Sequence, residues 1–101
     1  MSIRNEIAVL VDAAVRRAQA AGELPSVALP DPVIERPANE THGDYASSLP
    51  LRLARAARMA PMQIAAAIEK HLQAPDYIGE VQVLPPGFIN FRLAEIGRAH
   101  V

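Results

Sequence analysis

Cysteine is absent from this 101-residue chain, so disulfide bonds and thiolate metal sites are excluded. Aromatic residues are scarce, with two Phe, two Tyr and no Trp. No apolar run approaches the roughly 20 residues that a membrane-spanning helix needs. The first six residues lack the basic-then-apolar order of a secretory signal peptide. These absences give no indication of export or of membrane contact, and they allow a reducing compartment.

An excess of positive charge is also lacking, because the formal net charge at pH 7 is −1. This near balance argues against a broad electrostatic nucleic-acid binder, so any polyanion would be held locally by a few placed groups. Nine of the ten basic residues are Arg, whose forked guanidinium suits phosphate. The abundance of Arg and Ala together also agrees with GC-rich codon usage.

The residues that are present suit one small globular domain. Half of the chain is hydrophobic and 21% is charged, which is enough apolar surface to bury a core. Nineteen residues are Ala, so the core is expected to consist of small aliphatic side chains.

The first third of the chain predicts a helix followed by an extended segment. Apolar residues recur at helical spacing between Ser2, a candidate N-cap, and Gly22, a candidate terminator. Three prolines lie within 24–32, which predicts an extended crossing segment. Residues 33–36 predict a short strand, and 38–44 a polar loop.

A second helix is expected over about 45–59, with Asp44 as its N-cap. Gly43 is expected to supply a backbone conformation that other residues resist. Pro50 would lack a helix hydrogen bond and clash with the preceding turn. Either the helix kinks there or it begins at Ser48 with Pro50 in its first turn, and we favour a kink or an irregular first turn.

The last part of the chain predicts a third helix and a hairpin. Pro61 opens the helix, which the segment 73–76 ends. The strands of the hairpin alternate over 81–83 and 88–93, and the turn between them contains Gly87. Residues 94–101 show no pattern, and we expect a truncated linker or an unmatched tail there.

The final strand carries the strongest candidate site. Its two-residue period places Phe88, Asn90 and Arg92 on the face opposite the core. A ring can stack on an unpaired base, an amide can pair with the base edge, and Arg can bind a phosphate. The alternative is an ordinary exposed sheet face with one stray Phe.

Two further groups are weaker candidates. Arg52, Arg55 and Arg58 occupy about a third of the second helix's circumference, as either a phosphate-tracking stripe or a solvated face. His42 and Asp44 suggest acid–base chemistry, yet no Ser or Cys nucleophile is paired with them and they are too few for a metal site. A structural role for this pair is the alternative, and we expect no catalytic or metal site in the chain itself.

The order of motifs resembles one family. The segments are ERP at 35–37, HGDYAS at 42–47, LRLAR at 51–55, Pro61 with Ile64 and Ala65, VQV at 81–83 and PGFINFRL at 86–93. This series resembles the N-terminal additional domain of arginyl-tRNA synthetase over about residues 33–93.

The resemblance implies an α/β domain of the α+β type, with about three helices on one face of a small antiparallel sheet, over residues 1–93. It implies recognition of the D-loop at the outer corner of arginine tRNA, with Phe88 and Asn90 presented to a D-loop base. Arg92, Arg52 and Arg55 are expected to assist, and Gly43, Asp44 and Gly87 to serve as cap and turn residues.

The resemblance also implies a parent enzyme, an ATP- and magnesium-dependent arginine–tRNA ligase of the cytoplasm, whose catalytic domain would be a partner of this one. The ATP-binding signatures of that enzyme are absent here. The alternative is a free-standing α/β interaction module that kept the fold without RNA binding. A third hypothesis is a small hydrolase that uses His42 and Asp44.

Overall fold

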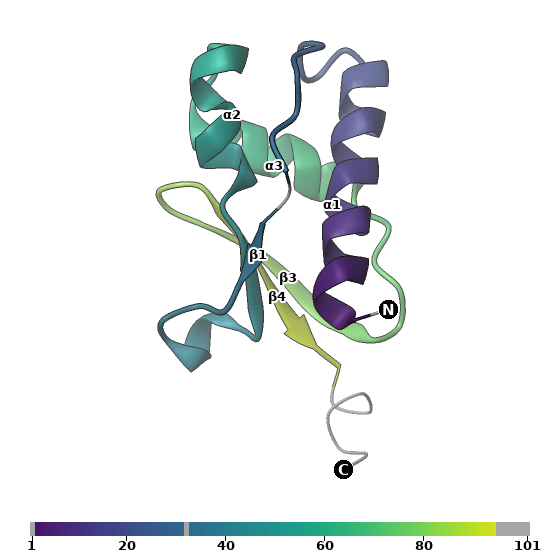
Figure 1. Ribbon diagram of the computed structural model, residues 1–101, viewed down its shortest axis with the longest axis vertical. Coiled ribbons are helices and arrows are strands. Elements are labelled where there is room, and N and C mark those ends of the chain that lie inside the picture. Colours follow the sequence, from purple (N-terminus) through teal and green to yellow (C-terminus); the bar gives the residue numbers. More distant parts are fainter. Residues whose placement is uncertain (1, 32, 95–101) are drawn as a thin grey trace.

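The computed structural model describes residues 2–31 and 33–94 (Figure 1). Within them, three α-helices, one 3₁₀ helix and four strands follow one another as α1 (Ile3–Ala20), β1 (Ile34–Glu35), η1 (Glu40–His42), β2 (Tyr45–Ser47), α2 (Leu49–Ala57), α3 (Pro61–His71), β3 (Ile78–Leu84) and β4 (Phe88–Leu93). The tail predicted over 94–101 lies, apart from its first residue, outside the described residues. No helix in the described ranges is long and apolar enough to cross a membrane.

The strands form one antiparallel sheet in the order β1-β2-β4-β3. The three α-helices lie on one side of the sheet (Figure 1). The short helix η1 belongs to the loop between β1 and β2, which lies at the other end of the molecule. Helix α3 contacts α1, α2 and both hairpin strands, so it joins the helical layer to the sheet. The predicted fold class, a small antiparallel sheet covered by three helices on one face, is confirmed.

Helix α1 begins and ends as its sequence predicts. The Ser2 hydroxyl accepts a hydrogen bond from the Asn5 amide at 3.1 Å, which satisfies one of the free N–H groups of the first turn. Gly22 follows the helix with φ of +79°, a left-handed conformation that favours glycine. The buried stripe comprises Ile7, Val11, Ala14, Val15 and Ala18.

The predicted helix over 45–59 is wrong in its first four residues. Residues Tyr45–Ser47 form strand β2, and α2 begins only at Leu49. Ser48 is the N-cap residue, and Pro50 lies in the first turn, where a missing N–H costs no helical hydrogen bond. The second of our two alternatives for Pro50 is therefore correct, and the favoured kink is not present.

Asp44 does not cap α2. Its carboxylate Oδ2 instead accepts a hydrogen bond from the Leu93 amide at 2.8 Å, and its own amide donates to the Phe91 carbonyl, also at 2.8 Å. Asp44 thus ties the start of β2 to the end of β4. The expected cap becomes a link between two strands, made by residues that are 49 positions apart in the sequence.

This link yields a testable expectation. Asp44→Ala should lower the free energy of unfolding by about 1.5–3 kcal/mol, the usual contribution of a hydrogen bond to a charged group. Asp44→Asn, which retains an acceptor oxygen, should lose less. Urea unfolding of the two variants beside the wild type measures the difference, and equal midpoints for all three would contradict this role of Asp44.

The C-terminal ends of α1 and α3 are joined by polar contacts. The Arg17 guanidinium donates to the His71 carbonyl at 2.6 and 3.0 Å. The Glu23 carboxylate lies 3.0 Å from the His71 ring and 3.3 Å from the Lys70 ammonium. The hydrogen bond with His71, assisted by Lys70, holds the pKa of Glu23 below its ordinary value. These contacts fix the helical layer on the side of the sheet away from the candidate site.

Candidate nucleic-acid interface

The side chains of β4 alternate between the two faces of the sheet, as the sequence predicts. Ile89 and Phe91 are 0% and 1% exposed and pack in the core under the helices. Phe88, Asn90 and Arg92 occupy the opposite face. Strand β4 pairs with β2 along one edge and with β3 along the other, so these three side chains have a neighbouring strand on each side.

Small and polar side chains surround Asn90 on this outer face. Asn90 is paired with Ala46 of β2 and with Gln82 of β3, and Ala46 is in turn paired with Glu35 of β1. Ala46 contributes only a methyl group beside the Asn90 amide. The sheet is therefore hollow at this position, where a larger residue in β2 would fill the space.

The loop that contains η1 folds over this face and is held there by β4. The Asn90 Nδ2 donates to the His42 carbonyl at 2.8 Å, and the Arg92 Nη2 donates to the Thr41 carbonyl at 2.7 Å. Arg92 also lies 3.5 Å from the Glu80 carboxylate. The sequence suggested an open row of three side chains. In the structure, Asn90 is only 5% exposed and Arg92 is occupied by the loop.

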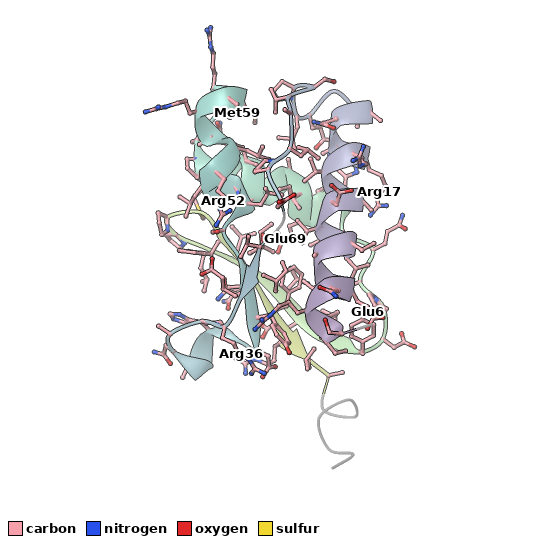
Figure 2. The ribbon with its side chains drawn as sticks, viewed as in Figure 1. Glu6, Arg17, Arg36, Arg52, Met59 and Glu69 are labelled. Atoms are coloured by element: carbon pink, nitrogen blue, oxygen red, sulfur yellow. The ribbon has the colours of Figure 1, made fainter. Side chains whose placement is uncertain are left out.

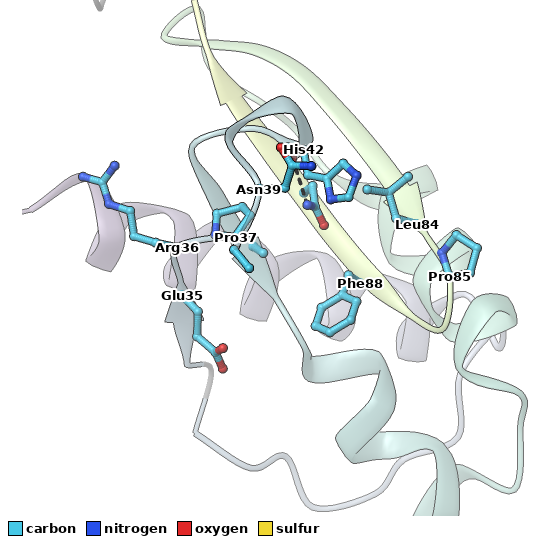
Figure 3. A pocket seen from close by; sticks show the side chains of 11 residues that line it. Glu35, Arg36, Pro37, Asn39, His42, Leu84, Pro85 and Phe88 are labelled. Atoms are coloured by element: carbon cyan, nitrogen blue, oxygen red, sulfur yellow. Dashed lines mark hydrogen bonds between the residues drawn. The ribbon is translucent and has the colours of Figure 1, made fainter.

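Loop, strands and hairpin turn together line a partly open pocket of about 570 Å³, within the size range of small-ligand sites. Figure 3 shows the Phe88 ring and the His42 imidazole on different sides of it, with Leu84 and Pro85 along a third. Eleven residues line it: Glu35, Arg36, Pro37, Ala38, Asn39, His42, Ala46, Leu84, Pro85, Phe88 and Asn90.

Asn90 contributes an unused hydrogen-bond acceptor to this pocket. Its Oδ1 is buried and has no partner among the described residues. The amide cannot simply be reversed, because the His42 carbonyl requires a donor and Nδ2 supplies it. A buried acceptor without a partner costs free energy. A ligand with an N–H group at this point would remove that cost.

The other pocket residues limit what chemistry the site can perform. The lining contains His42 but not Asp44, whose Oδ2 binds the β4 backbone, and it contains no Ser, Thr or Cys nucleophile. Among the described residues, no group of three or more His, Asp or Glu side chains could hold a metal ion. The Arg36 guanidinium lies 4.9 Å from the centre of the Tyr45 ring and turns away from the pocket (Figure 3). The geometry suits binding of a flat, polar-edged group rather than hydrolysis by His42 and Asp44.

The two glycines assigned to turns are constrained by close contacts. Gly43 has φ of +112°, and a Cβ there would lie 2.8 Å from the Phe91 carbonyl oxygen. A Cβ on Gly87 would lie 2.5 Å from Pro61 Cβ and 3.3 Å from Leu51 Cδ2. The hairpin turn therefore packs directly on the corner between α2 and α3. Sequence reasoning expected Gly43 to be special but did not detect this packing of Gly87.

The arginines of α2 lie apart from the pocket lining. Arg52 and Arg55 are exposed in the helix, and Arg58 is exposed just after it in a left-handed conformation. Sequence reasoning missed the pocket residues that lie outside β4 and the hairpin turn, chiefly Pro37, Asn39 and Ala46. Their only signal was their position in the polar loop and in a strand that resembled a helix.

Comparison with known proteins identifies the family. The family model described as the arginyl tRNA synthetase N terminal domain matches residues 5–93. The arginine–tRNA ligase of Moorella thermoacetica is 52% identical over 91 residues, 89% of this chain and 16% of that protein. The arginine–tRNA ligase of Dehalococcoides mccartyi strain CBDB1 is 38% identical over 95 residues, 94% of this chain and 17% of that protein.

Solved structures agree in fold. The arginyl-tRNA synthetase of Thermus thermophilus superposes with a TM-score of 0.68 at 25% identity, covering 92% of this chain and 14% of that one. The Plasmodium falciparum enzyme gives a TM-score of 0.75 at 17% identity, covering 93% and 16%. The chain spans about one sixth of the length of its curated relatives. By sequence match and by fold, it belongs to the family of arginyl-tRNA synthetase N-terminal domains.

Proposed function

We propose that this chain recognises the D-loop at the outer corner of arginine tRNA by taking one unpaired base into the pocket between β4 and the η1 loop. The observation that carries the proposal is the buried, unpartnered Oδ1 of Asn90 beside the Phe88 ring. An aromatic face and an amide edge are the two contacts with which proteins hold an unstacked base.

The pocket also suggests which edge of the base is read. The Asn90 Nδ2 already donates to the His42 carbonyl, whereas Oδ1 has no partner among the described residues, so the unsatisfied atom of the amide is an acceptor. The base should therefore present an N–H donor, an amino or imino group, to Oδ1. The Phe88 ring beside it offers an aromatic surface on which such a base can stack.

We assign the remaining parts of the reaction to the catalytic domain of a cytoplasmic arginine–tRNA ligase. The pocket does not fit a nucleoside triphosphate, because its lining has no phosphate-binding glycine loop and its Arg36 is stacked on Tyr45. ATP, magnesium and the attachment of arginine therefore belong to that partner domain. The function of this chain is to hold the tRNA.

The test is the affinity of the chain for arginine tRNA. Phe88→Ala should weaken binding by about 5- to 150-fold, because base–aromatic stacking contributes about 1–3 kcal/mol. Met62→Ala, which removes an exposed apolar side chain that does not line the pocket, is the matched control and should bind as the wild type does. Fluorescence titration with labelled tRNA measures all three proteins.

A base scan links the effect to the D-loop. Substituting each unpaired D-loop base in turn should reveal one position that matters for the wild type and matters much less for Phe88→Ala. Equal affinities of the wild type and Phe88→Ala would contradict the proposal and would favour an interaction module without an RNA role. A base dependence outside the D-loop would retain the pocket and reject the D-loop as its target.

A further inference from the structure

Helix α2 carries an unusual concentration of free positive charge. Between Asp44 and Glu69 the chain contains no acidic residue, whereas Arg52, Arg55 and Arg58 all lie there. In the described part of the chain, none of these three guanidinium groups has a hydrogen-bond or ion-pair partner. Five other cationic side chains have a partner within the molecule: Arg16, Arg17, Arg36, Lys70 and Arg92.

The arginines share the solvent side of a helix whose other side is buried. Leu49 and Leu53 pack in the core, while Arg52 and Arg55, three residues apart, are about 60° apart around the axis and about 4.5 Å apart along it. Favourable interaction with the helix dipole would account for Arg55 in the last turn. It does not account for Arg52, because that effect falls off within the last turn.

Helix α2 is connected to the walls of the pocket at two points. Helix α2 begins two residues after β2, whose Ala46 lines the pocket. The hairpin turn that connects the pocket residues Pro85 and Phe88 packs through Gly87 on Leu51. Figure 2 labels Arg52 in the part of α2 nearer the sheet. We take the hairpin turn as the path by which a polyanion with one residue in the pocket would reach the arginines.

We propose that Arg52 and Arg55 form a phosphate-binding strip, which holds the sugar–phosphate backbone of the RNA whose base occupies the pocket. This inference rests on the proposed function and extends it from one base to the adjoining backbone. Guanidinium groups suit it because they make forked contacts with phosphate oxygens. The strip also reconciles RNA binding with a net charge of −1, because three of the four unpartnered Arg and Lys side chains in the described part of the chain lie in or directly after α2.

The salt dependence of tRNA binding tests the strip. Each phosphate contact that is lost should reduce the slope of log affinity against log salt by about 1, so Arg52→Gln with Arg55→Gln should reduce it by about 2. Between 50 and 200 mM salt, the wild type should therefore lose about 16-fold more affinity than the double variant. The loss should be the same for tRNAs that differ in the D-loop base, because phosphates carry no sequence information.

The matched control is Arg4→Gln with Arg16→Gln, which changes the net charge equally but lies on α1. It should leave the slope within experimental error of the wild type. Arg58 is kept, because its left-handed backbone couples it to the end of α2. The unfolding curve of each variant should match that of the wild type, because the substituted side chains are exposed.

The outcomes separate this proposal from the previous one. Equal slopes for the α2 and α1 double variants, with Phe88→Ala still weakened, would overturn the strip and leave the pocket. A reduced slope for the α2 variant, with Phe88→Ala binding normally, would support the strip as a phosphate site and overturn the pocket as a base site. A chain that binds no tRNA at 50 mM salt would overturn both.

Discussion

Phe91→Ala should cost about 3–5 kcal/mol of unfolding free energy, the usual range for truncating a buried Phe. Phe91 is 1% exposed and is the largest fully buried side chain among the described residues. It lies in the centre of the sheet, paired with Tyr45 and with Val81. Domains of this size have about 5–15 kcal/mol in total, so urea unfolding should show a large shift or a partly unfolded variant.

Phe88→Ala is the control for this prediction. It removes the same ring from the same strand, three residues away, but from the pocket face. The free energy of unfolding should fall much less than for Phe91→Ala, whereas tRNA affinity should fall. If Phe88→Ala unfolds the chain and Phe91→Ala does not, the assignment of the two faces of β4 is wrong.

Gly43→Ala should be the second most destabilising of the changes considered. At φ of +112° an alanine is strained, which costs about 1–3 kcal/mol. Its Cβ would also lie 2.8 Å from the Phe91 carbonyl oxygen, the atom that accepts a hydrogen bond from the Asp44 amide. The loop would have to move away from β4, so the variant should lose both stability and tRNA affinity.

Gly22→Ala separates the backbone cost from the clash. Gly22 also has a positive φ, +79°, but nothing lies within 4 Å of its Cβ position. That variant should lose about 1–2 kcal/mol, the cost of a left-handed conformation alone, and should bind tRNA normally. Thermal unfolding compares the pair, and a Gly22→Ala loss equal to that of Gly43→Ala would show that the contact with Phe91 does not matter.

Local patterns in the sequence determined several elements correctly. Helix α1 and the start of α3 follow from apolar spacing and from Ser2 and Pro61, whose effects act within one turn. The hairpin and the two faces of β4 follow from strict alternation across a Pro-Gly turn. Each of these features is specified by neighbours close in sequence, so it can be predicted without knowing what packs against it.

Strand β2 could not be predicted in the same way. Tyr45–Ser47 is too short for a period to be visible, and Asp44 before it looks like a helix cap. The segment is a strand because β1 and β4 provide partners on both sides, and the β4 partners lie more than 40 residues away. Pairing with distant strands outweighs the local preference here, as is common for short segments.

The same distinction applies to the candidate site. Sequence alone determined that Phe88 and Asn90 share a face and that Gly43 holds an unusual conformation. Only the tertiary structure decided that the η1 loop covers this face, that Ala46 leaves it hollow, and that the Asn90 amide has one atom bonded and one free. A side chain's direction follows from its own strand's geometry, but a cavity and an unsatisfied atom depend on what every other segment leaves unfilled.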